Sequence, residues 1–506
     1  MARASRLGTS GARWVRAAAC AIVAAGCGDD GGGGGGPTPE GLQILSGSEQ
    51  VDTIAAELPM PLVVQVFDAP DHPAAGIEVQ VGDRTCDLGC RAFSIMRPGA
   101  PSQLQTTLET DETGQVTVLL RLGTIPGSAL VPISVPSLQL ADTARYTVEP
   151  GNAASFQSTP DTAIPPGASV TVHAVAQDRL GNPRPETVSY QSRTPSIIEV
   201  SSDGQVTARR VGTGVVGLTA GEVTGELTVA VVPPGTISMT NVSTEIGYIQ
   251  VVSLDGTGRD SLASTGLSAA GASTWSPDGE TIIYRSWDGD GGPLRRIPAT
   301  GGPSTPLPVS GFPIQDAESP QYSSDGTWVY FHGFSSGLPP FISGEIWRVH
   351  PDGSGYERVG PAGSSSIADR NPTPSPDGTR VAYVSNRGLL PGFSTLRVLT
   401  IAGGAETDLS LEASYPRWSP TGTWIAFTQV DVNLHGTVWL VHPDGSEAHQ
   451  VSPDSLFIAW GAGLAWSPDG KYLIAVDGVG MMLLDLEGNH VRLPATKGNA
   501  FPSWKP

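Results

Sequence analysis

The chain has 506 residues and a formal net charge of −20. Its 64 glycines and 44 prolines interrupt most long stretches, which argues against long helices and favours an all-β protein of several domains. The acidic balance excludes a nucleic-acid-binding protein, because phosphate contacts need clustered Lys and Arg. Ordinary solubility explains the acidity, although weak attraction of basic partners or divalent cations stays open.

Residues 1–26 are predicted to be a secretion signal. They carry four arginines and no acidic residue, and the apolar run 17–25 is too short to span a bilayer. The sequence Val-Ala-Ala-Gly-Cys at 23–27 resembles a bacterial lipobox, with valine in place of the usual leucine. The resemblance implies that Cys27 is lipidated; an ordinary secreted protein with an incidental cysteine is the alternative. Residues 27–40 then form a glycine-rich tether to a membrane.

The cysteines differ in their expected fates. Cys20 leaves with the signal and Cys27 is the lipidation site, so Cys86 and Cys90 remain in the mature chain. In an oxidising compartment this close pair is expected to form a local disulfide. A metal or redox site is the alternative, but no histidine lies nearby and the spacing is not C-x-x-C.

Residues 41–151 are predicted to form one β-sandwich. The run 61–67 is typical of a buried strand, the run 77–81 alternates in polarity, and a turn at 110–115 leads into the apolar run 116–120. Short strands separated by turns at this spacing favour a sandwich. The arrangement resembles the bacterial Ig-like group 1 domain.

Residues 152–233 are predicted to form a second unit of the same kind. The segment D-G-x-V-T-A at 203–208 and the segment G-T-x-x-V at 212–216 carry this prediction. They resemble the bacterial Ig-like group 2 domain. Residues 233–235, Pro-Pro-Gly, form the linker to the second half of the chain.

The second half of the chain repeats one turn. Each copy resembles W-S-P-D-G and precedes a short apolar strand; the five copies begin at Trp275, Tyr322, Pro374, Trp418 and Trp466, and Trp504 begins a truncated sixth. A period of about 40–50 residues points to a propeller or a solenoid. The aromatic residue is expected to pack between neighbouring blades, and Asp-Gly is a strong hairpin signal.

A second turn alternates with the first and occurs six times, at residues 254–256, 300–301, 351–353, 403–404, 443–445 and 487–488. The extra turn lies before the first tryptophan copy, and the extra tryptophan lies after the last complete blade. Residues 236 to about 265 would therefore supply three strands of one blade, and residues 501–506 would supply its innermost strand. Such a closed ring leaves no open edge, so residues 236–506 are predicted to form six blades.

The turn, the apolar strand and the later Asp-Gly turn together resemble the TolB-type propeller repeat. The resemblance covers a little over half of the chain and implies a six-bladed β-propeller. It implies little about activity, because propellers carry many functions.

No catalytic, cofactor or metal site is predicted. The G-x-S-x-G pattern at 333–337 leads into a proline-rich loop and not into a helix. The acidic loop 288–292 lacks the later glutamate of an EF-hand. His350 and His442 occupy equivalent positions in non-adjacent blades and should not share a metal. The propeller arginines are scattered along the sequence and do not suggest a cluster.

The expected function is therefore binding. The chain would be a lipid-anchored envelope protein with two Ig-like domains as a stalk. Its propeller would be a non-catalytic recognition head for an envelope protein, a peptide or a glycan. Long insertions at 333–344 and 386–394, with three phenylalanines, are the expected binding loops. A propeller lyase or hydrolase, which needs His, Arg or carboxylates converging in one pocket, and a purely structural adhesion protein are the alternatives.

Overall fold

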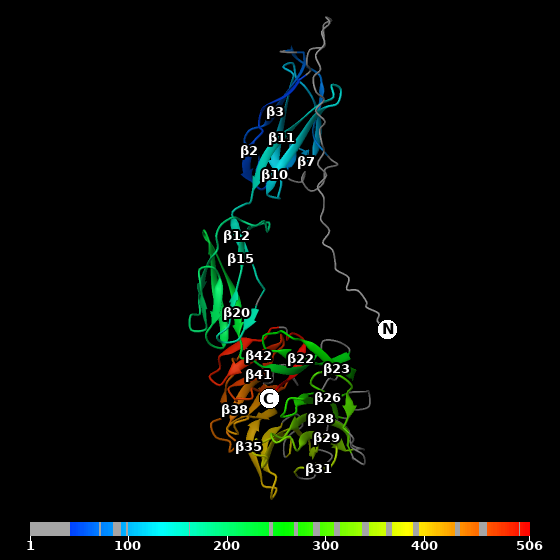
Figure 1. Ribbon diagram of the computed structural model, residues 1–506, viewed down its shortest axis with the longest axis vertical. Helices are drawn as coiled ribbons and strands as arrows, with labels where there is room; N and C mark the ends of the chain where they lie inside the picture. The colour runs from blue at the N-terminus through cyan, green and yellow to red at the C-terminus, as the bar shows by residue number, and fades with distance from the viewer. Residues whose placement is uncertain are drawn as a thin grey trace, which may run out of the picture. The chain divides into compact units, whose positions relative to one another are not determined.

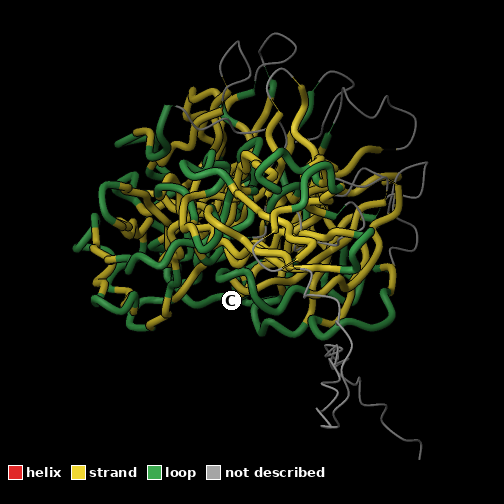
Figure 2. Tube along the Cα trace, turned by 90° about the horizontal axis from the view of Figure 1, so that it is seen from above, coloured by secondary structure: helices red, strands yellow, loops and turns green. Residues whose placement is uncertain are grey.

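The structure is a computed structural model that describes residues 41–506 except 70–71, 84–92, 98–99, 161, 242–245, 268–271, 287–293, 308–313, 336–343, 361–366, 388–393, 431–435, 455–462 and 495. All regular structure in these residues is β-strand, as Figure 2 shows. The predicted all-β class is therefore confirmed. Across the same ranges, the structure contains no apolar helix of a length that could cross a membrane.

Residues 41–149 form one compact unit built from two sheets (Figure 1). The order in the first sheet is β1 (Gly41–Ser46), β3 (Leu62–Ala69), β9 (Gln115–Leu122), β6 (Phe93–Arg97) and β7 (Ala100–Gln103), with β4 (His72–Pro73) also paired to β3. The order in the second is β2 (Gln50–Thr53), β11 (Leu140–Glu149), β10 (Gly127–Val135), β5 (Glu78–Gly82) and β8 (Gln105–Glu109). Alternate side chains of β3, β9 and β10 enter one shared core, as expected of a sandwich.

Residues 150–506 form the second compact unit, which begins with three small sheets around one core. The largest has the order β13 (Thr162–Ile164), β20 (Val223–Val231), β19 (Gly212–Ala220) and β16 (Ser189–Ser192). The others are β14 (Ser169–Thr171), β18 (Gln205–Ala208) and β17 (Ile198–Val200), and the pair β12 (Ala153–Ser158) and β15 (Ala174–Asp178).

Six four-stranded antiparallel sheets come next within the described residues, and they are the blades of a propeller. Blade 1 contains β21 (Thr236–Asn241), β22 (Ile246–Ser253), β23 (Asp260–Leu267) and β44 (Asn499–Trp504); blade 2 contains β24 (Ser273–Trp275), β25 (Thr281–Arg285), β26 (Leu294–Pro298) and β27 (Thr305–Pro306). Blade 3 contains β28 (Ile314–Tyr322), β29 (Val329–Ser335), β30 (Glu345–Val349) and β31 (Glu357–Arg358); blade 4 contains β32 (Asp369–Pro374), β33 (Arg380–Ser385), β34 (Thr395–Thr400) and β35 (Glu406–Glu412). Blade 5 contains β36 (Ser414–Trp418), β37 (Ile425–Val430), β38 (Gly436–Val441) and β39 (His449–Gln450); blade 6 contains β40 (Leu464–Trp466), β41 (Tyr472–Val476), β42 (Met481–Asp485) and β43 (His490–Arg492).

The ring closes as the sequence predicts. Strand β44, from the end of the chain, pairs antiparallel with β21 and is the innermost strand of blade 1. In each of the five complete copies, the glycine that ends the S-P-D-G-type turn has a positive φ between 68° and 76°. Its N–H donates to the carbonyl of the turn serine, for example Gly422 to Ser419 at 2.9 Å. The repeated turn therefore has the hairpin role that its sequence indicates.

The aromatic residue of the turn packs between blades, also as predicted. Trp418 shares a core cluster with Val384 of blade 4, and Trp466 shares one with Leu440 of blade 5. The Trp466 indole N–H also donates to the carbonyl of Arg417 at 2.9 Å, and that of Trp275 donates to the carbonyl of Ser503 at 3.0 Å. These contacts hold the innermost strands of neighbouring blades together.

Candidate functional site

One residue from each innermost strand lines a common cavity of about 380 Å³. In every repeat it is the residue immediately before the first residue of the W-S-P-D-G-like turn. We call this set the channel ring; its members are Thr274, Gln321, Thr373, Arg417, Ala465 and Ser503. Because six equivalent positions converge, the cavity lies where the blades meet at the centre of the propeller. This is the place where propellers commonly present a channel.

A backbone irregularity places these residues. Two positions before each ring residue the chain adopts a left-handed conformation in four blades, with φ of 53° at Ser319, 53° at Asn371, 49° at Tyr415 and 52° at Phe501. The strand register shifts at the same points. Left-handed φ is strained for serine and aromatic residues, and such bulges redirect a strand's side chains. The repeated left-handed residue therefore helps to orient the side chains that line the cavity.

The cavity wall is aromatic and rich in proline. Four tryptophans, one tyrosine and the prolines of the S-P turns contribute to it. The ring hydroxyls are partly occupied, since Thr373 Oγ1 accepts the Trp418 N–H at 3.0 Å and Thr274 Oγ1 accepts the Tyr322 N–H at 3.4 Å. The lining residues include no Asp or Glu, and Arg417 is the single cationic side chain among them. The chain is strongly acidic, so this lining is electrostatically unusual.

Arg417 is buried with 7% of its surface exposed. Its Nη1 donates to the carbonyl of Pro416 at 2.9 Å, and it forms no ion pair with any residue that the structure describes. Burial lowers its pKa from 12.5 to about 10, while Tyr415 acts in the opposite direction. The guanidinium is therefore charged at neutral pH without a carboxylate to balance it. Burying an unpaired charge is costly, so this arrangement points to a functional role.

A second charged cluster lies beside Tyr415. Glu318, on β28, pairs with Arg285 Nη2 at 2.8 Å and with His332 Nε2 at 3.2 Å. Burial alone would raise the pKa of Glu318, but His332, Arg285 and Arg370 together lower it to about 2. These groups balance one another, and none of them belongs to the lining of the ring cavity.

The prediction that the propeller arginines form no cluster is wrong for Arg370 and Arg417. Both act electrostatically on Tyr415, whose pKa is raised by burial and by Glu318. The two arginines are 47 residues apart in the sequence, and they lie on the neighbouring innermost strands β32 and β36. The separation of the two arginines in the sequence gives no indication that both lie near Tyr415.

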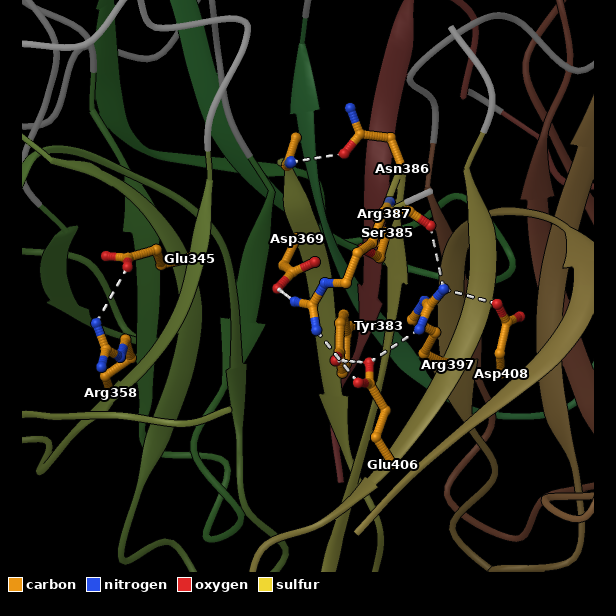
Figure 3. A network of polar contacts seen from close by, with 11 residues as sticks. Glu345, Arg358, Asp369, Tyr383, Ser385, Asn386, Arg387, Arg397, Glu406 and Asp408 are labelled. Carbon is orange, nitrogen blue, oxygen red and sulfur yellow. Dashed lines mark hydrogen bonds and ion pairs between the residues drawn. The ribbon is translucent and has the colours of Figure 1, made fainter. Parts of the chain in front are cut away.

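Blade 4 contains a further polar network, shown in Figure 3. Arg387 pairs with Asp369 at 2.6 Å and with Glu406 at 3.2 Å. Arg397 pairs with Glu406 at 3.4 Å and with Asp408 at 2.7 Å. The Tyr383 hydroxyl also donates to Glu406. Burial raises the pKa of Asp369 even though Ser385 and Arg387 oppose the rise. The network links the innermost strand of the blade to its outermost strand, and its internal pairing indicates a structural role.

The two repeat-equivalent histidines are structural. His350 stacks on Trp328 and His442 stacks on Trp424, each with ring centroids 3.9 Å apart. No group of three His, Cys, Asp or Glu residues in the described parts of the chain is arranged to hold a metal. The G-x-S-x-G pattern begins inside β29, where Gly333 pairs with Glu345 of β30.

Other predicted sites lie outside the described residues. They are Cys27, Cys86 and Cys90, the acidic loop 288–292, and most of the two insertions at 333–344 and 386–394. The lipidation and the disulfide remain predictions.

The channel ring is absent from the predictions made from sequence. Its members are chemically unlike one another, so no shared letter marks the position. The available signal is positional: the residue before the first residue of each turn is the one that the repeat brings to the centre.

No protein-family profile matches the chain. An uncharacterised Agrobacterium fabrum protein, Atu1656, is 30% identical over 176 residues, which are 31% of this chain and 53% of that protein. The chain thus spans about half the length of this curated relative. TolB from Acinetobacter baumannii is a similar solved structure, with 17% identity, a TM-score of 0.45, and coverage of 64% of this chain and 84% of TolB. An oligogalacturonate lyase from Vibrio parahaemolyticus has 12% identity, a TM-score of 0.35, and coverage of 63% and 98%. The propeller assignment stands on the chain's own six sheets.

Proposed function

We propose that this chain is a cell-envelope recognition protein whose propeller binds its partner in the ring cavity. The observation that carries the proposal is the convergence of six repeat-equivalent residues on one cavity of about 380 Å³. A volume of this size suits a small ligand or a short segment of a larger one. The aromatic walls supply contact area, and the ring supplies hydrogen-bonding groups and one charge.

The rest of the chain presents this head to its surroundings. Cys27 would carry the lipid, residues 28–40 the flexible tether, and the two N-terminal β domains the stalk. The second β domain shares a core with the propeller, because Val211 and Ala230 pack in the same cluster as Tyr472 and Leu483. Metabolic labelling with a tritiated fatty acid tests the anchor: the parent chain should incorporate label and Cys27→Ser should not. Free-thiol titration of the unfolded mature chain tests the Cys86–Cys90 disulfide, which two reactive thiols would exclude.

The enzyme alternative gains little from the structure. Arg285, Glu318 and His332 do converge, as an enzyme site would need. However, the pKa of Glu318 is about 2, so this carboxylate is no general acid near neutral pH. His332 is buried with 2% exposure, and its two ring nitrogens face Glu318 and the Asn371 N–H. The cluster therefore has the character of an internal ion-pair network.

The decisive experiment fills the cavity without removing a contact. Ser503 lines the cavity and is half-buried, so Ser503→Tyr adds bulk there, and Ser503→Ala is the matched control. The full chain is immobilised and exposed to solubilised envelope from the source cell. We expect a saturable partner to bind the parent and the alanine variant and to be lost with the tyrosine variant. A partner bound equally by all three would place recognition elsewhere, for example on the insertions at 333–344 and 386–394.

A further inference from the structure

We propose that the ring cavity recognises a carboxylate group of its ligand, and that Arg417 is the residue that binds it. The inference rests on the proposed function and names the chemistry of the bound group. The chain carries 49 acidic residues, yet the cavity lining includes none of them. Arg417, which is buried, is the one cationic residue of this lining.

The Arg417 guanidinium has more N–H donors than its hydrogen bond to Pro416 uses. Arginine has five N–H donors, and one of its nitrogens, Nη1, is engaged by Pro416. No described carboxylate is within ion-pair distance of it. A planar fork of this kind matches a carboxylate in bidentate geometry. The backbone of Arg417 is held in place, because the Trp466 indole N–H donates to its carbonyl and the bulge at Tyr415 sets the course of its strand.

The charge of the site favours a monoanion. The lining provides one positive charge and the neutral groups of Thr274, Gln321, Thr373 and Ser503. A phosphate or sulfate carries more negative charge and commonly uses several cations or a nest of backbone N–H groups. A carboxylate is balanced by Arg417 alone. The walls of tryptophan and proline then contact the apolar or ring-shaped body that bears the carboxylate.

Two sources can supply this group, namely the C-terminus of a peptide and a uronic-acid sugar. The test therefore titrates the full chain with two matched pairs of probes and follows binding by calorimetry. The first pair is N-acetyl-alanyl-alanine and its C-terminal amide, and the second is D-glucuronate and D-glucose. Inorganic sulfate serves as the dianion probe. The variants are Arg417→Met, which keeps an aliphatic side chain without charge, and Arg296→Met, a control at an exposed position of β26.

We expect at least one acid to bind tenfold or more tightly than its neutral partner, since hydrogen bonds to charged groups are stronger than neutral ones. The preferred pair identifies the source. Arg417→Met should bind the acid no better than the neutral probe, and Arg296→Met should behave as the parent. Equal binding of acid and neutral probes, tighter binding of sulfate, unchanged binding by Arg417→Met, or no binding of either acid at millimolar concentration would each overturn the proposal.

Failure of the carboxylate assignment can be distinguished from failure of the proposed function. If Ser503→Tyr abolishes partner binding but Arg417→Met leaves it unchanged, the cavity is the recognition site and the carboxylate assignment is wrong. If neither substitution changes partner binding, the proposed function is wrong.

Discussion

Replacing Arg417 by methionine should stabilise the propeller even though it removes a proposed binding residue. Burial lowers the pKa of Arg417 from 12.5 to about 10. One pKa unit corresponds to about 1.4 kcal/mol, so the buried charge destabilises the ligand-free protein by about 3.5 kcal/mol. Methionine retains the apolar packing of the side chain but loses the hydrogen bond from the charged guanidinium to Pro416, which contributes about 2 kcal/mol. The expected net gain in the free energy of unfolding is about 1.5 kcal/mol.

Tryptophan fluorescence isolates the relevant transition. Apart from Trp14 in the predicted signal, every tryptophan of the chain lies between Trp275 and Trp504, within the propeller. Urea unfolding of the full chain, followed by this fluorescence, therefore reports propeller stability without a signal from the N-terminal domains. The buffer should be free of carboxylates, because a bound anion would stabilise the parent and mask the effect.

Arg296→Met is the control for the same chemical change at an exposed position, where the expected effect is within about 0.5 kcal/mol. The reasoning would be refuted if Arg417→Met lowered the free energy of unfolding, or raised it no more than the control. Either result would mean that Arg417 gains as much from its surroundings as its burial costs.

Three further predictions concern the propeller scaffold. Glu318→Gln should lower the free energy of unfolding at pH 7 by about 2–3 kcal/mol, because it leaves buried partners unbalanced. The pKa of Glu318 is depressed from 4.5 to about 2, so the stability that its carboxylate contributes is present above about pH 4.5 and is lost as the pH falls towards 2. Urea titrations at pH 7 and pH 3 should therefore show a smaller loss of stability in Glu318→Gln at pH 3. An equal loss at both pH values would contradict the assignment. Gly378→Ala should cost about 1 kcal/mol, because φ is 69° while the added Cβ meets no atom within 4 Å; a neutral effect in the same assay would argue against a conformational cost. Trp466→Phe removes the indole donor to Arg417 and should lower stability by about 1–2 kcal/mol, whereas retention of full stability would show that this link between blades is dispensable.

The fold was accessible from sequence because it rests on local chemistry. The glycine of an Asp-Gly turn needs positive φ, and Gly279 and its equivalents have it. The second kind of turn has one extra copy at the start of the repeats, and the tryptophan turn has one extra copy at their end. These two fragments complete one blade only if the ring closes, and β44 completes blade 1. The aromatic residue of the turn could be predicted to pack between blades because a large apolar side chain beside a turn is stabilised by burial. Trp418 is buried against blade 4.

The site was not accessible in the same way. Arg417 is separated from Thr373 by one repeat and from Gln321 by two, and nothing in the residue types marks them as neighbours. Convergence at the centre of a ring is a property of the closed fold. The unbalanced charge of Arg417 is likewise visible only once the cavity lining is known to contain no carboxylate. Aligning the repeats and reading the column before the turn would have identified the ring.

The central claim is that the ring cavity is the recognition site. It is tested most directly by measuring partner binding to the full chain with Ser503→Tyr beside a variant shortened within 333–344, both shown by fluorescence to be folded. We expect the tyrosine substitution to abolish binding and the shortened variant to retain it. Binding that survives the filled cavity and is lost with the insertion would contradict the account.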